Sequence, residues 1–208
     1  MGTDAGLQVN ALSCAHQQIV LFSNLSFHLK PGVALIVEGT NGSGKSSLLR
    51  LLTGLTTPAA GDIHWQGKPT THDLISYQQQ LHFIGHNNGT KLGLTALENL
   101  RLAGALSMDK TNMAESVLKT LQLEQQTHTL AKYLSAGQKR RLALARLFLV
   151  QKPLWLIDEP FTGLDTQTQA LFLSALTAHL QSGGICVLST HHALTLHAEV
   201  QTLKLPLC

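Results

Sequence analysis

The glycine-rich stretch at residues 39–46 constrains the fold of this chain more than any other part of the sequence. It reads GTNGSGKS and matches the pattern G-x-x-x-x-G-K-[ST] at every fixed position. The apolar run Val33–Val37 before it is typical of a buried parallel strand, and Ser46–Leu52 after it is typical of a helix. A strand, a glycine loop and a helix start in this order direct backbone N–H groups and the positive end of a helix dipole at one point. The stretch therefore predicts an α/β fold with a phosphate-binding loop for a nucleoside triphosphate.

The side chains of this loop suit a nucleoside triphosphate and its metal ion. Gly39, Gly42 and Gly44 allow a tight turn and a close approach of the backbone to phosphate. Lys45 supplies a mobile positive charge for the β- and γ-phosphates, and the Ser46 hydroxyl is a ligand for Mg²⁺. A chance match in a glycine-rich turn is the alternative, and the agreement between pattern and flanking elements argues against it. The candidate nucleotide-binding residues here are Gly39, Thr40, Asn41, Gly42, Ser43, Gly44, Lys45, Ser46 and Ser47.

The composition indicates one globular domain. The 208 residues can hold one α/β domain with an insertion, and 44% hydrophobic against 13% charged residues indicates a packed core. A net charge of +3 with scattered Lys and Arg gives no reason to expect a nucleic acid partner. Cys14, Cys186 and Cys208 lie far apart without a CxxC pair, which argues against a disulfide framework and a zinc site. The sequence has no basic-then-apolar leader and no apolar run of about 18–20 residues, so we expect a soluble, cytosolic chain; if it serves a membrane process, another chain must span the membrane.

The remaining sequence alternates between strand and helix patterns. Residues 7–29 predict short strands broken by polar turns, and Asp62–Trp65 predicts one arm of a hairpin across Gln66–Lys68. Between about Leu94 and Leu149 glycine is sparse and apolar residues recur at spacings of three and four, which predicts a helical insertion. Strands are also expected at Leu81–Ile84, Leu154–Ile157 and Ile185–Leu188, and a helix near Gln167–Leu180. The pattern predicts a mainly parallel sheet with a helical lobe inserted in its middle.

Two acidic residues follow the predicted strand that precedes Pro160. Asp158 emerges at the carboxyl end of that strand, which lies beside the phosphate-binding loop in a parallel α/β sheet, so its carboxylate can hold Mg²⁺. Glu159 is one residue further and can act as general base on a water in line with the γ-phosphate. A helix N-terminus with acidic caps is the alternative, and the phosphate-binding loop favours the catalytic interpretation.

A third motif, Leu134–Gln138, precedes a strongly helical run. Ser135 is a natural N-cap for that helix, which by itself predicts no more than a capped helix. The Ser-Ala-Gly segment also exposes backbone donors and a hydroxyl at the positive end of a helix dipole, an arrangement that suits a γ-phosphate. The following Lys139, Arg140 and Arg141 are expected on a solvated face of the helix rather than in a ligand site.

Five motifs in this order resemble the nucleotide-binding domain of ABC transporters, over essentially the whole chain. They are Gly39–Ser46, Leu134–Gln138, Leu156–Pro160, Thr162–Asp165 and Ser189–His191. The resemblance implies a P-loop NTPase (RecA-like) fold in a single domain at 1–208, in which 1–86 and 147–208 form the mainly parallel core with an antiparallel β subdomain and 87–146 form the helical subdomain. It also implies Mg-ATP hydrolysis, integral-membrane transporter subunits as partners, and a second copy of the chain in a head-to-tail dimer.

The resemblance assigns roles to the third motif and to a loop after the acidic pair. The third motif would complete the ATP site of the second copy, and Asp165 would belong to the loop that communicates between the two sites. The residues of the third motif that would contact nucleotide are Ser135, Ala136, Gly137 and Gln138.

By the same resemblance His191 would be the switch histidine that touches the γ-phosphate and the attacking water. Independently of the family, His191 follows a predicted buried strand, which places it at the same carboxyl rim as Lys45 and Glu159. A surface histidine is the alternative, and His192 is an ambiguous neighbour.

Two positions depart from the family pattern. A glutamine is usual nine residues before the Thr of the LTxxEN segment, and counting back from Thr95 leads to His86. An imidazole there can still contact Mg²⁺-bound water or sense the γ-phosphate, so His86 is a candidate nucleotide and metal contact. The family also stacks an aromatic residue of the first strands on adenine, whereas residues 13–20 contain none. His16 could stack weakly, and an unstacked base is equally compatible with the sequence.

These departures narrow the resemblance to one subfamily. The pair Gly85-His86, the segment LTALENL at 94–100 and the segment DEPFT at 158–162 resemble the ATP-binding subunits of the bacterial cytochrome c maturation (haem export) system. The resemblance implies a peripheral position on the cytoplasmic face of the inner membrane. The alternatives are the ATPase subunit of another ABC exporter or importer and a membrane-independent ABC ATPase; a nucleotide-gated scaffold is a further class, against which Glu159 speaks.

Overall fold

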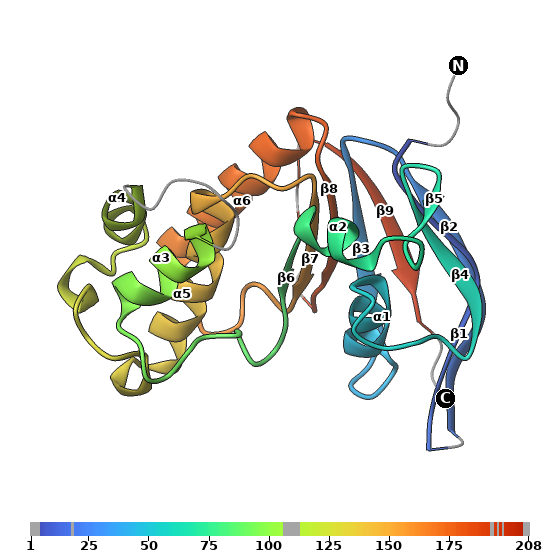
Figure 1. Ribbon diagram of the computed structural model, residues 1–208, viewed down its shortest axis with the longest axis horizontal. Coiled ribbons are helices and arrows are strands. Elements are labelled where there is room, and N and C mark those ends of the chain that lie inside the picture. The colour runs from blue at the N-terminus through green and yellow to red at the C-terminus, as the bar shows by residue number, and fades with distance from the viewer. Residues whose placement is uncertain are drawn as a thin grey trace.

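The computed structural model describes residues 5–17, 19–105, 113–191, 194, 196 and 198–205. Figure 1 shows two sheets side by side, with a group of helices projecting from one side of them. In chain order the elements are β1 (Leu7–His16), β2 (Ile19–Leu29), β3 (Val33–Glu38), α1 (Lys45–Leu52), β4 (Ala60–Trp65), β5 (Lys68–Pro69), α2 (Leu74–Gln79), β6 (Leu81–Ile84), α3 (Ala96–Ala105), α4 (Ala114–Thr120), the 3-10 helices η2 (Glu124–Gln126) and η3 (Ala131–Tyr133), α5 (Ala136–Leu149), β7 (Leu154–Asp158), α6 (Thr166–Gln181), β8 (Ile185–Ser189) and β9 (Glu199–Lys204).

A parallel sheet forms the centre of the chain, with the strand order β6-β7-β8-β3-β9. Leu156 of β7 lies opposite Val187 of β8, and Ile36 of β3 lies opposite Leu188. β7 and β8 are buried along their whole length, because the sheet is covered on both faces. The strands predicted from apolar runs are confirmed, and the carboxyl ends of β3, β7 and β8 meet at one edge of the sheet. That edge carries the candidate site.

Helices cover both faces of this sheet (Figure 1). On one face α1 packs through Leu48 into a core that also contains Leu35 of β3. On the other face α5 and α6 pack through Leu144 and Phe172 into a core that contains Ile36 of β3. Successive side chains of a strand point to opposite faces, so neighbouring residues of β3 belong to different cores.

The antiparallel sheet, in the order β2-β1-β4-β5, corrects the prediction of short broken strands at 7–29. β1 and β2 are continuous strands of 10 and 11 residues. The β1–β2 pairing shifts register between Val9 and Leu12 and again between Leu12 and Cys14, and Ala11 and Asn24 have positive φ angles of 47° and 54°. Polar residues that suggested turns lie at these bulges, which absorb an extra residue without ending the strand. The hairpin predicted after β4 is confirmed, since Trp65 pairs with Lys68 of β5.

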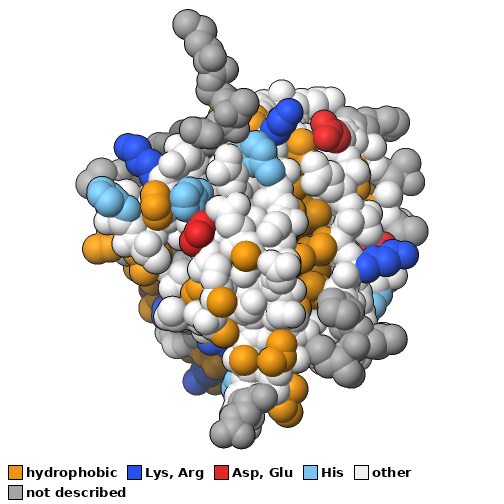
Figure 2. All heavy atoms as spheres, turned by 90° about the vertical axis from the view of Figure 1, so that its right-hand side faces the viewer, with side chains coloured by type: hydrophobic (Ala, Val, Ile, Leu, Met, Phe, Trp, Pro, Cys, Tyr) orange, Lys and Arg blue, Asp and Glu red, His pale blue; other side chains and the backbone are white. Residues whose placement is uncertain are grey.

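The outer face of the antiparallel sheet is turned toward the viewer in Figure 2. Uncharged side chains cover most of its described part, with hydrophobic side chains and histidines between them. Lys and Arg are scattered over this face rather than gathered in a patch (Figure 2).

The predicted helical insertion forms a separate lobe of α3, α4 and α5 (Figure 1). Its core contains Leu97 and Leu100 of α3, Leu118 of α4 and Leu142 of α5. α5 also packs on the sheet through Leu144, so this helix belongs to both parts and runs through the boundary predicted at residue 146. The assignment of residues 87–146 to the helical subdomain stays a prediction, because α5 packs in both parts and continues to Leu149. Within the described residues, no helix combines the length and the apolar character that a membrane crossing requires.

A buried histidine predicts how the stability of this fold depends on pH. His82 of β6 donates from Nε2 to Val150 O at 2.8 Å, and burial lowers its pKa to about 3. An unfolded chain has a histidine pKa near 6.5, so between pH 6.5 and 3 the unfolded state binds a proton that the folded state does not. Stability therefore falls as pH falls through this window.

We expect the free energy of unfolding of the native chain to drop about 1 kcal/mol more than that of His82→Gln between pH 7 and pH 5.5. The glutamine amide can also donate to Val150 O but does not titrate, so it is a matched control. Denaturant titrations at the two pH values measure the difference, and equal losses in both proteins would contradict the prediction.

Candidate functional site

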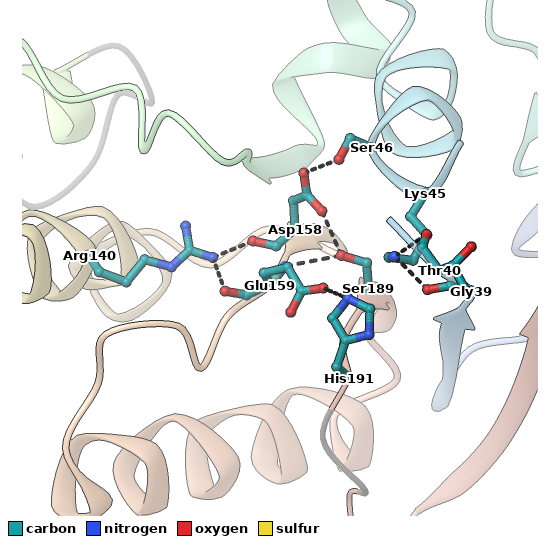
Figure 3. A network of polar contacts seen from close by, with 9 residues as sticks. All are labelled: Gly39, Thr40, Lys45, Ser46, Arg140, Asp158, Glu159, Ser189 and His191. Atoms are coloured by element: carbon teal, nitrogen blue, oxygen red, sulfur yellow. Dashed lines mark hydrogen bonds and ion pairs between the residues drawn. The ribbon is translucent and has the colours of Figure 1, made fainter. Parts of the chain in front are cut away.

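The glycine-rich loop connects β3 to α1 at the carboxyl edge of the parallel sheet. Gly44 has a φ of 95°, and a Cβ there would lie 3.2 Å from the Phe22 ring, so both backbone and packing favour glycine. Lys45 is buried, and its Nζ donates to Gly39 O at 2.7 Å and to Thr40 O at 3.0 Å (Figure 3). Two carbonyls at the start of the loop therefore hold the Lys45 ammonium against the loop backbone.

A hydroxyl and a carboxylate meet where the sequence predicts a metal site. Ser46 Oγ at the start of α1 donates to Asp158 Oδ2 at 2.7 Å, and Ser189 Oγ at the end of β8 donates to Asp158 Oδ1 at 2.6 Å (Figure 3). Asp158 is 4% exposed, so its charge is nearly removed from bulk water. Oxygen donors of this kind suit Mg²⁺, which is usually bound by one or two protein groups together with phosphates and water. Ser46 and Asp158 therefore fit a magnesium ion that accompanies a triphosphate.

Glu159 occupies a strained backbone position next to that carboxylate. Its φ is 50°, in the left-handed region that a residue with a side chain enters only when its surroundings enforce it. Its N–H donates to Ser189 O at 3.1 Å and to Ser189 Oγ at 3.0 Å. Glu159 Oε1 lies 3.2 Å from His191 Nε2, and the two side chains are 22% and 52% exposed. Glutamate and histidine therefore form a partly solvated pair at the rim of the site.

One pocket of about 480 Å³ brings these groups together. Leu21 of β2 and Thr162 also line it, although no sequence motif marked Leu21 as a site residue. Its position in the chain, on β2 and outside every motif, is too weak a signal to find it. The predicted residues that line the pocket are Asn41, Gly42, Gly44, Lys45, Ser46, Ser47, His86, Asp158, Glu159 and His191.

The two histidines predicted from departures in the family pattern lie in different places. His86 lines the pocket together with Asp158 and Glu159. His16 is exposed at the end of β1, opposite Ile19, and is not among the residues that line the pocket. The structure thus brings His86 to the predicted site and does not bring His16 there.

The third motif forms a capped helix start outside this pocket. Ser135 Oγ accepts from Gln138 N–H at 3.2 Å, and Gln138 Oε1 accepts from Ser135 N–H at 2.8 Å, so the two residues form a reciprocal capping box at the start of α5. A Cβ on Gly137 would lie 2.6 Å from Gly163 O, so the helix start packs directly on the loop before α6. Ala136 lines a second pocket of about 210 Å³ that also contains His86 and Glu159. The predicted N-cap is confirmed.

Asp165 caps the next helix. Its Oδ1 accepts from Thr168 N–H at 2.8 Å at the start of α6, and this hydrogen bond lowers the pKa of the Asp165 carboxyl. Arg141 of α5 lies 3.9 Å from the same carboxylate. The structure assigns Asp165 a capping position, and its predicted role in communication between two sites stays a prediction.

Arg140 overturns the expectation that the basic triplet after the third motif is solvated. Lys139 and Arg141 are partly exposed, but Arg140 is 5% exposed. Its position follows from the helical period: Arg140, Leu144 and Leu147 form one buried stripe of α5 that faces the sheet. This spacing was visible in the sequence, and the charge of the residue obscured it.

The Arg140 guanidinium contacts two segments of the site. Nη2 donates to the carbonyls of Asp158 and Glu159, the latter at 2.8 Å, and Nη1 donates to Gly85 O at 3.1 Å and Asn88 Oδ1 at 2.8 Å. Burial lowers the pKa of Arg140, and the charges of Asp158 and Glu159 oppose that shift. The guanidinium thus connects the end of β7 with the segment that follows β6.

Comparison with known proteins identifies the family. A family model described as ABC transporter matches residues 22–162. This chain belongs to the ABC transporter family. The cytochrome c biogenesis ATP-binding export protein CcmA of Methylococcus capsulatus is 42% identical over 205 residues, which cover 98% of this chain and 99% of that protein. The protein of the same name from Escherichia coli O157:H7 is 42% identical over 191 residues, which cover 90% of each.

Solved structures agree with this assignment. An ATP-binding subunit of an ABC transporter superposes with a TM-score of 0.81 at 28% identity, over 90% of this chain and 80% of that one. A dimeric bacterial ABC transporter cassette superposes with a TM-score of 0.81 at 24% identity, over 95% of this chain and 94% of that one, and shows the shared fold. The P-loop NTPase fold expected from the sequence is confirmed. As an ABC subunit, the chain binds and hydrolyses ATP.

Proposed function

We propose that this ABC ATPase powers export in bacterial cytochrome c maturation, with haem as the cargo that its membrane partners handle. The observation that carries the proposal is the full-length likeness to curated export proteins of cytochrome c biogenesis, at 42% identity over 98% of the chain. The intact pocket supports the energy-coupling part of the proposal, because the groups for phosphate binding, metal binding and water activation all line it.

In this proposal the glycine loop binds the triphosphate of ATP. Its backbone N–H groups and the N-terminus of α1 bind the phosphates, while Lys45 releases its bonds to the loop carbonyls and turns to the β- and γ-phosphates. Ser46 and Asp158 hold Mg²⁺, which neutralises charge on the phosphate oxygens when bound. His86, which also lines the pocket, would contact metal-bound water or the γ-phosphate. His16 is the candidate for weak stacking on adenine, and its position at the end of β1 does not support that role.

Glu159 is the proposed general base. Its carboxylate points into the pocket from the end of β7, where it can take a proton from a water in line with the γ-phosphate. His191, 3.2 Å from that carboxylate, orients it and contacts the γ-phosphate. The left-handed backbone of Glu159 directs the side chain to this position, and catalysis then rests on positioning and electrostatics.

The ATP site is completed by a second copy in the proposed dimer. Ser135, Ala136, Gly137 and Gln138 lie at the positive end of α5, where the free side of the Ser135 hydroxyl and backbone donors can reach a γ-phosphate bound by the partner. Asp165, packed next to this helix start through Gly163, would sense the state of the other site. The helical subdomain at 87–146 would carry the third motif across to the partner's core at 1–86 and 147–208.

The proposed membrane partners dock between the helical lobe and the sheet. A pocket of about 200 Å³ lies where the segment that follows β6 meets α3 and α5, and it is lined by residues 88–91, by Asn99 of α3 and by Arg146 of α5. The chain would lie at the cytoplasmic face of the inner membrane as a peripheral subunit of integral-membrane transporter proteins. Nucleic acid is not among the proposed partners.

Glu159→Gln tests the general base. We expect the rate of ATP hydrolysis to fall about 100-fold or more while ATP binding persists, because an amide keeps the shape but cannot accept the proton. Steady-state hydrolysis and equilibrium binding of ATP measure the two quantities. Glu115→Gln on the exposed surface of α4 is the matched control and should leave both unchanged. Undiminished hydrolysis by Glu159→Gln would remove this residue from the proposed role.

Mixing two inactive variants tests the head-to-tail site. Lys45→Met disables the phosphate loop, and Ser135→Asp keeps the N-cap while it places a negative charge against the γ-phosphate. In a head-to-tail dimer of one copy of each, one site has both defects and the other has neither. An equal mixture should therefore regain about a quarter of the native rate, because about half the dimers are mixed and each has one intact site.

Ser135→Asn, a neutral cap, is the control for the charge in that experiment. Hydrolysis that stays at the level of the separate variants after mixing would contradict the shared site.

Purification of the tagged chain from membranes tests the transport assignment. We expect integral-membrane subunits that handle haem to co-purify with it, and we expect the same set with Glu159→Gln, which leaves the docking surface intact. Mass spectrometry identifies the subunits. Recovery of a sugar or peptide permease instead would reject haem export and leave the ATPase activity unaffected.

A further inference from the structure

We propose that Arg140 is a positioning residue for hydrolysis, which holds Glu159 in its active geometry and ties that geometry to the segment leading into the helical lobe. The inference rests on the proposed role of Glu159 as general base. Arg140 lies 19 residues before Glu159 in the sequence and reaches it from α5 (Figure 3).

The strained backbone of Glu159 is held from both of its peptide groups. Its N–H is bound by Ser189 O and Ser189 Oγ, and its C=O accepts from Arg140 Nη2 at 2.8 Å. A left-handed conformation is unfavourable for a residue with a side chain and persists where neighbours over-determine it. Ser189 fixes one side of the residue, and Arg140 fixes the other together with a longer bond from Thr162 N–H at 3.4 Å. Loss of Arg140 would let the backbone relax and turn the carboxylate away from the attacking water.

The same guanidinium also holds the segment that carries His86, which lines the pocket. Nη1 donates to Gly85 O and Asn88 Oδ1, on either side of His86. Arg146, six residues further along α5, donates to Asn88 O at 2.9 Å, and its other hydrogen bonds to described residues go to the carbonyls of Ala143 and Phe83 rather than to Asp158 or Glu159. Movement of this segment with the lobe would thus reach Glu159 through Arg140. Arg146 holds the segment without touching the acid.

Burial makes the guanidinium a rigid connection. Arg140 is 5% exposed, and the four N–H groups of Nη1 and Nη2 are directed to protein acceptors instead of water, while the buried Nε has no acceptor among the described residues. Arg presents these donors in a fixed planar fork, whereas the ammonium of Lys is a single point charge. A lysine at this position could bind the carbonyls of Asp158 and Glu159 or the Gly85–Asn88 segment, but not both in this geometry.

A cycle of variants tests the proposal. We expect Arg140→Gln to lower kcat for ATP hydrolysis about 10–100-fold with KM for ATP changed less than about threefold, because the phosphate loop is untouched and only the base is misplaced. Arg140→Lys should recover part of the lost kcat. In the Glu159→Gln background, Arg140→Gln should cause no further loss in single-turnover rate, because there is no base left to position.

Arg146→Gln is the matched control, since it removes a second arginine, half-buried, from the same helix. Arg146→Gln should change the single-turnover rate by the same factor with and without Glu159→Gln. The effect of Arg140→Gln should vanish in the Glu159→Gln background. Melting temperatures show whether each variant is folded, and Arg140→Lys takes the place of Arg140→Gln in the cycle if the glutamine variant does not fold.

Equal, multiplicative losses from Arg140→Gln in both backgrounds would overturn the positioning role, and so would a raised KM with kcat unchanged. Full activity of Glu159→Gln alone would reject the general base and with it this inference. If Glu159→Gln alone loses most of the hydrolysis rate, and Arg140→Gln lowers the rate by the same factor in both backgrounds, the role of Glu159 stands and only that of Arg140 is rejected.

Discussion

The carboxylate of Asp158 is the interaction on which the rest of the site depends. Its two oxygens accept from Ser46 at the start of α1 and from Ser189 at the end of β8, and its backbone carbonyl accepts from Arg140 of α5. Asp158 is only 4% exposed, and its charge is tolerable there because each of its two carboxylate oxygens accepts a hydrogen bond. Parallel strand order makes this possible, since Asp158 and Ser189 are register partners at the same edge.

Helix α5 unites the two parts of the chain. One stripe of the helix, with Leu142 and Ala145, belongs to the core of the helical lobe, and another, with Ala143 and Leu144, belongs to the core under the sheet. Its first residues carry the capped motif, and its Arg140 and Arg146 reach the site segments. Through its contacts with the lobe core, the core under the sheet and the site segments, α5 links the lobe to the pocket directly. The domain boundary predicted inside this helix illustrates that a sequence division can cross a single structural unit.

Sequence reasoning found the parts of the site that local rules dictate. The glycine loop, the acidic pair at a strand end and the cap at Ser135 each follow from backbone geometry over a few residues, and the parallel sheet follows from uninterrupted apolar strands. The failures need long-range information. The register shifts of β1 depend on its pairing with β2, and the burial of Arg140 depends on carbonyls 18 and 19 residues away.

Other features lay between these extremes. The helical stripe through Arg140, Leu144 and Leu147 was present in the sequence, but the three consecutive cations masked it. The contact between Gly137 and Gly163 could not be found, because it joins two loops whose approach is set by the packing of α5 against α6.

The positive φ of Glu159 has a consequence for the evolution and engineering of this chain. Glycine or asparagine at that position would release backbone strain, so selection for thermal resistance alone would favour a residue that cannot deprotonate water. Thermal stability and the rate of ATP hydrolysis therefore place opposite demands on the residue at position 159. Variants selected for thermal stability should therefore be screened for their rate of ATP hydrolysis as well as for their melting temperature.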